Sequence, residues 1–87
     1  MKEVLQKIVD KAGSFGLPNA DITYAQEFLK NHEFGLCLET IVTQIYEYEI
    51  KIDEEFYQLV TKAAQKLKMP ISNVDYIKTL LANPDNN

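Results

Sequence analysis

Apolar side chains recur at three- and four-residue spacings along most of the chain, which is the period of helices that bury one face. The first such piece predicts a helix over residues 2–12, with Gly13 where a C-terminal cap belongs. A second helix is expected to be capped by Asn19 or Asp21 and to end in a left-handed turn at Asn31. The expected buried faces of these helices are Val4, Leu5, Ile8, Val9, Ala12, Ile22, Ala25, Phe28 and Leu29.

Two further helices follow. The third should begin near His32 or Glu33, and we place it centrally because it is the most apolar piece. The fourth should begin at Asp53 as N-cap and be stopped by Pro70. Its first turn carries anions and its last turn cations, which suits the helix dipole: Glu54, Glu55, Lys66 and Lys68. The expected inner faces are Phe34, Cys37, Leu38, Ile41, Val42, Ile45, Phe56, Leu59, Val60, Ala63 and Leu67.

A fifth helix is predicted from Ser72 to Pro84, with Asp75 completing a variant of the capping box. Its apolar positions are Val74, Ile77, Leu80 and Leu81. Residues 85–87 are expected to fray at the chain end.

Residues 46–53 alternate aromatic or aliphatic side chains with charged ones, which is the period of a half-buried strand. No other segment alternates, and a single strand cannot satisfy its own backbone polar groups. We therefore favour a helix end over residues 46–49 and an extended connector over 50–52. An edge strand offered to a partner stays open as the alternative.

These elements predict an all-α fold, a small bundle of four to five short helices forming one domain over residues 1–87. The chain is 46% hydrophobic and 25% charged, which is enough apolar material for an autonomous core. A domain this small leaves little room for a deep substrate cleft, so its size favours binding over catalysis. We see no signal peptide or membrane span, and Cys37 has no disulfide partner, so a cytoplasmic location is expected.

Charge narrows the choice of partner. The chain has nine basic residues, all of them Lys, against thirteen acids, and its net charge is −4. Residues 18–55 hold two Lys and nine acids, a regional charge of −7, and both flanking regions are mildly basic. The lack of Arg and the negative field argue against nucleic-acid binding and favour a basic partner.

Catalytic and cofactor chemistry finds little support. His32 and Cys37 are five residues apart, which on one helix puts them on separated faces, and Cys37 falls on the apolar stripe. One His and one Cys cannot build a typical zinc site, and the glycines match no phosphate-binding loop. We expect no enzyme activity, no metal and no cofactor. A small hydrolase using paired acids would need converging carboxylates and has no motif here.

The acidic middle region also carries tyrosines: Tyr46 and Tyr48 alternate with Glu47 and Glu49, ahead of the acids at residues 53–55. Aromatic rings surrounded by carboxylates are typical of an interface that attracts a basic protein. The simpler interpretation is that Tyr46 is buried and the acids only keep the domain soluble.

Three stretches resemble a known family: HEFGLCLE at residues 32–39, IYE at 45–47 and IKIDEEF at 50–56. They are similar to the immunity proteins of the MafI type, partners of polymorphic toxins in interbacterial competition, including contact-dependent growth inhibition (CdiI-like). Cys37 stands where the family usually has Ala. The similarity covers about residues 22–69. The nuclease-colicin immunity proteins share this size, acidity and helical class, but their Tyr-Tyr-Pro segment is missing here, so they serve only as an analogy.

The resemblance implies a helical protein that stays in the producing cell and binds a cognate toxin domain, often a nuclease and in some members an EndoU-type ribonuclease. Such a toxin has a basic surface because it must bind RNA or DNA. The toxin contacts we expect are Glu33, Glu39, Glu47, Tyr48, Glu49, Asp53 and Glu54, with Gly35 and Cys37 assigned to helix packing. The alternative is a small helical adaptor or regulatory domain that binds another protein, and a homodimer through the third helix is one form of this alternative.

Overall fold

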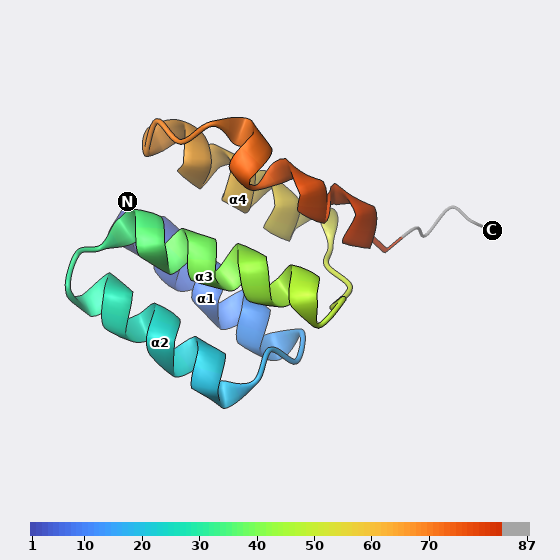
Figure 1. The fold of residues 1–87 in the computed structure, drawn as a ribbon, viewed down its shortest axis with the longest axis horizontal. Helices are drawn as coiled ribbons and strands as arrows, with labels where there is room; N and C mark the ends of the chain where they lie inside the picture. The colour runs from blue at the N-terminus through green and yellow to red at the C-terminus, as the bar shows by residue number, and fades with distance from the viewer. Residues whose placement is uncertain (83–87) are drawn as a thin grey trace.

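The computed structural model describes residues 1–82 (Figure 1). Within them the chain forms the expected all-α bundle, which consists of four α-helices followed by two short 3₁₀ helices. The elements are α1 (Lys2–Ser14), α2 (Asn19–Lys30), α3 (Phe34–Glu47), α4 (Glu54–Lys66), η1 (Ile71–Asn73) and η2 (Asp75–Leu80). The predictions for Pro84 and residues 85–87 lie outside the described residues.

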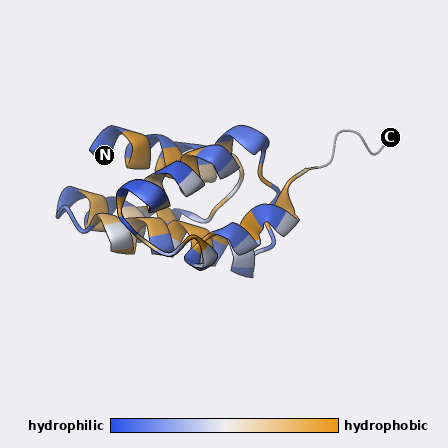
Figure 2. Cartoon of the chain, turned by 90° about the horizontal axis from the view of Figure 1, so that it is seen from above, coloured by the Kyte–Doolittle hydropathy of each residue, from blue (hydrophilic) through white to orange (hydrophobic). Residues whose placement is uncertain are grey.

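Helix α3 is central, as its apolar sequence predicts. It packs against α1, α2, α4 and η2, and its interface with α2 is the most extensive in the bundle. Apolar faces turn inward and hydrophilic faces outward (Figure 2). Most of the expected core residues are buried, and no polar or charged residue among residues 1–82 is buried. Seven expected core residues are only partly buried: Val4, Ile22, Phe28, Phe34, Leu59, Leu67 and Leu81.

All four α-helices end in the same motif, in which a residue with positive φ follows the C-cap. The left-handed residues are Gly16, His32, Glu49 and Lys68. After α2, for example, the Glu33 N–H donates to the Phe28 carbonyl at 2.8 Å and the His32 N–H donates to the Leu29 carbonyl at 3.1 Å. This pair of bonds is the Schellman motif, which satisfies the last carbonyls of a helix.

Three predicted helix stops are therefore wrong in detail. Gly13 lies inside α1, and the left-handed position after that helix belongs to Gly16. Asn31 has φ −91°, and the left-handed residue after α2 is His32. Helix α4 ends at Lys66, ahead of Pro70, so Lys68 lies beyond the helix. After α2 and α4 the left-handed position belongs to His32 and Lys68, which residue type alone does not mark as helix ends.

Helix starts were predicted with mixed success. Asp53 is the N-cap of α4, as expected, and its Oδ1 accepts a hydrogen bond from the Phe56 N–H at 2.8 Å. Neither Asn19 nor Asp21 caps α2, because the helix already begins at Asn19, after Pro18. Helix α3 begins at Phe34, just after the two residues proposed as its start.

The alternating segment is a helix end and a connector, as favoured above. Helix α3 ends at Glu47, two residues earlier than expected. The connector then makes a single parallel bridge between Ile52 and Leu81. The Ile52 N–H donates to the Leu80 carbonyl and the Ala82 N–H donates to the Ile52 carbonyl, both at 3.0 Å. This one bridge holds the connector against the end of η2, and residues 1–82 contain no strand.

The predicted fifth α-helix is wrong, because the structure has the 3₁₀ helices η1 and η2 there. Val74, Ile77 and Leu80 are spaced by three residues and are all buried. A 3₁₀ helix has three residues per turn, so this spacing keeps all three side chains on the core face. Ser72 lies inside η1, and the residues before η1 and η2 make no side-chain capping bond.

Candidate protein-binding surface

Most of the predicted contact residues gather where α3 passes into α4. We call Glu47, Tyr48, Glu49, Asp53, Glu54 and Glu55 the acidic corner, and all six are exposed. Glu49 and Glu54 are five residues apart, so an extended chain separates them by at most about 18 Å. The fold therefore brings five of the seven predicted contacts to one end of α3.

The end of α3 fixes the backbone of this corner. Tyr48 is the C-cap of α3, and Glu49 has φ +53°. The Ile50 N–H donates to the Ile45 carbonyl at 3.0 Å, which locks the turn. A Glu in the left-handed region is uncommon and costs free energy relative to Gly. The acidic corner thus presents Glu49 from a defined and mildly strained backbone.

Three carboxylates of the corner already have partners. Asp53 Oδ2 and Glu55 Oε1 lie 3.5 Å and 3.3 Å from the Lys11 Nζ, which joins the start of α4 to α1. Partial burial lowers the pKa of Lys11, but the hydrogen bonds and charges of Glu55 and Asp53 outweigh it and raise that pKa overall. Glu54 accepts a hydrogen bond from Gln58 at 2.6 Å. Asp53 therefore serves the fold first, as a cap and an ion-pair partner.

The side chains of Glu47, Tyr48 and Glu49 have no such partners. Within residues 1–82, their side chains make no hydrogen bond or ion pair. The Tyr48 side chain is 53% exposed. These three residues are the part of the corner most available to a partner.

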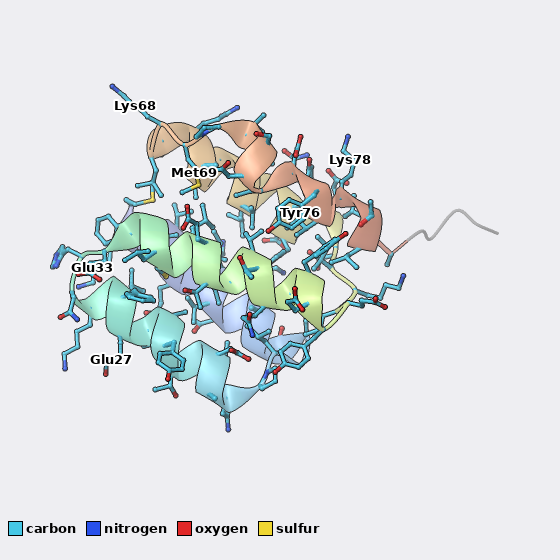
Figure 3. All side chains as sticks on the ribbon, viewed as in Figure 1. Glu27, Glu33, Lys68, Met69, Tyr76 and Lys78 are labelled. Atoms are coloured by element: carbon cyan, nitrogen blue, oxygen red, sulfur yellow. The ribbon has the colours of Figure 1, made fainter. Side chains whose placement is uncertain are left out.

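The two remaining predicted contacts lie elsewhere. Glu33 precedes α3 at the end opposite the acidic corner (Figure 3). A helix of fourteen residues is about 21 Å long, so Glu33 and Glu47 are well separated. Glu39 lies in the middle of α3, on a groove between α2 and α3. The seven residues therefore form one cluster and two outlying positions.

Sequence reasoning missed this groove between α2 and α3. It has a volume of about 450 Å³ and opens widely to solvent. Its lining residues are Asp21, Tyr24 and Phe28 of α2 and Leu36, Glu39, Thr40, Thr43 and Gln44 of α3. The Gln44 Nε2 donates to Asp21 Oδ1 at 3.0 Å and ties the two helices together. The sequence did contain one signal for the groove: Tyr24 and Leu36 are large residues that belong to neither of the predicted buried helix faces.

Tyr46 is a surface residue and not a core residue. It is 46% exposed, and its ring meets Tyr76 of η2 edge to face with 4.8 Å between centroids. Figure 3 shows Tyr76 beside the C-terminal half of α3. The pair holds η2 against α3 and leaves part of both rings exposed beside the acidic corner.

Cys37 is poorly suited to act as a nucleophile. Cys37 is fully buried, and burial raises the pKa of its thiol to about 11. A thiol of this kind remains protonated and is a poor nucleophile. No three His, Cys, Asp or Glu side chains within residues 1–82 are arranged to hold a metal ion. In the same range, none of the helices has the length and apolar character that crossing a membrane requires.

Comparison with known proteins adds no identification: no protein-family model, curated protein or solved structure matches the chain.

Proposed function

We propose that this chain is an immunity protein that binds a bacterial toxin domain with a basic surface and so neutralises it. The observation that carries the proposal is the acidic corner, in which the exposed Tyr48 lies between exposed acidic residues in the sequence. The resemblance to MafI-type immunity proteins also supports it. The resembling region, residues 22–69, includes α3, the connector and all of α4.

The mechanism is stoichiometric binding rather than chemistry. Carboxylates such as Glu47 and Glu49 would pair with Lys and Arg of the toxin, and the Tyr48 ring would supply buried contact area. Complementary charge speeds encounter, towards about 10⁸ M⁻¹ s⁻¹ at low salt. A nuclease, such as an EndoU-type ribonuclease, suits this surface because it must present cations to the phosphates of its substrate. The bound chain would cover those cations or the active site itself.

The proposal expects a toxin domain to be encoded directly upstream of this chain's gene, and co-expression with that domain tests the proposal. We expect the chain to restore growth that the toxin domain alone prevents, and to co-purify with it as a one-to-one complex. Light scattering on the purified complex gives the stoichiometry. Failure to protect the cells, together with the absence of a complex, would refute the proposal. Stable capture of a non-toxic protein would favour the helical adaptor instead.

A further inference from the structure

We propose that the groove between α2 and α3 is a second docking site, which receives a bulky apolar side chain flanked by Lys or Arg on the same basic partner. This inference rests on the proposed function, because it takes the partner to be a basic protein. It adds a contact surface, centred on Tyr24 and Leu36, that the acidic corner does not include.

The groove exists because small residues lie between large ones. Thr40 and Thr43 follow Leu36 along α3, and Tyr24 and Phe28 face them from α2. Tyr24 is 64% exposed and Leu36 is 48% exposed. Large apolar side chains that are exposed beside a hollow are typical of a surface that a partner covers, because binding removes their apolar area from water. A groove between two helices is also a common seat for a peptide segment with apolar anchors.

Charge selects the occupant. Only two charged residues line the groove, Asp21 and Glu39, and both are acidic. Gln44 holds Asp21 in place through its 3.0 Å hydrogen bond. Lys or Arg beside the inserted apolar side chain would pair with these carboxylates. A second copy of this chain fits poorly, because two such grooves face to face would oppose carboxylate to carboxylate.

The groove and the acidic corner belong to one continuous face. Leu36, Thr43 and Glu47 are spaced by seven and four residues, so they follow one side of α3. All three are exposed. A partner seated on the acidic corner can therefore extend along α3 into the groove. Acidic residues at both places would attract the same basic surface.

Matched variants of the full chain test the groove with the upstream-encoded toxin domain as the probe. Leu36→Ala and Glu39→Lys should each weaken binding at least tenfold, Leu36→Ala mainly through faster dissociation and Glu39→Lys also through slower association. The controls are Ile71→Ala on η1, where the side chain is 43% exposed, and Glu3→Lys on α1. Both controls should stay within twofold of the unmodified chain. Surface plasmon resonance gives both rate constants, and circular dichroism confirms that each variant folds.

The outcomes separate this inference from the proposed function. If the toxin domain binds the unmodified chain and both groove variants equally well, the groove proposal is wrong and the immunity function stands. If the unmodified chain does not bind the toxin domain, both fail together. A dimer of the chain that Leu36→Ala dissociates would also overturn the proposal, because a second copy would then occupy the groove.

Discussion

Asp53 shows how one side chain of the acidic corner can serve the fold. Its Oδ1 caps α4 through the Phe56 N–H, and its Oδ2 pairs with Lys11 of α1. An N-cap carboxylate contributes about 1 kcal/mol to helix stability. An ion pair this exposed contributes less, because water and salt screen it. Capping is therefore the larger role. A loss of binding in an Asp53 variant would consequently report on folding as well as on contact.

Two substitutions at Asp53 separate these roles. Asp53→Ala removes both and should lower the free energy of unfolding by about 1–2 kcal/mol. Asp53→Asn keeps a capping oxygen and loses only the ion pair, so it should cost less than about 1 kcal/mol. Urea denaturation measures both values. Lys11→Gln, which removes the ion pairs with both Asp53 and Glu55, should cost at least as much as Asp53→Asn. Equal losses for the Ala and Asn variants would mean that the charge, not the cap, is the main contribution.

At the scale of elements, the left-handed residues at the helix ends link stability to the proposed surface. Glu49 and Lys68 occupy equivalent positions after α3 and α4, with φ values of +53° and +58°. Glycine adopts this conformation without a steric penalty, so either side chain costs stability. Lys68 lies after α4, away from the acidic corner. Glu49 lies within the acidic corner, where binding a partner would offset the free energy that its left-handed backbone costs.

Glycine substitutions test this difference. Glu49→Gly and Lys68→Gly should each raise the free energy of unfolding by about 0.5–1 kcal/mol, because each relieves the same backbone strain. Only Glu49→Gly should also weaken toxin binding, since only it removes a proposed contact. Thermal unfolding and calorimetric titration measure the two effects. Equal binding by both variants would remove Glu49 from the interface.

The helical period predicted four α-helices and most of the core, because a buried stripe leaves a direct pattern in the sequence. The final segment was missed because a spacing of three was assigned to an α-helix, although Val74, Ile77 and Leu80 match a 3₁₀ period better. The acidic corner could be predicted because its residues all fall within one short segment of the sequence, residues 47–55. The groove could not, because it depends on how α2 packs against α3.

At the scale of the whole molecule, charge is unevenly distributed. The acidic excess belongs to α2, α3 and the start of α4, and four lysines follow in the rest of the described chain: Lys62, Lys66, Lys68 and Lys78. Lys68 and Lys78 project from the side of the bundle away from α2, whereas Glu27 lies on α2 (Figure 3). A molecule polarised in this way turns its acidic side towards a basic partner before contact.

The rate of association with the upstream-encoded toxin domain, followed by stopped flow across a range of salt concentrations, tests the central claim most directly. Replacing Glu47 and Glu49 by Lys raises the net charge from −4 to 0, and replacing Glu3 and Asp10 of α1 by Lys raises it equally. We predict that the Glu47/Glu49 variant associates more slowly and with a weaker salt dependence, whereas the Glu3/Asp10 variant stays close to the unmodified chain. Equal slowing in both variants would contradict the account, because it would assign the effect to net charge and not to the acidic corner.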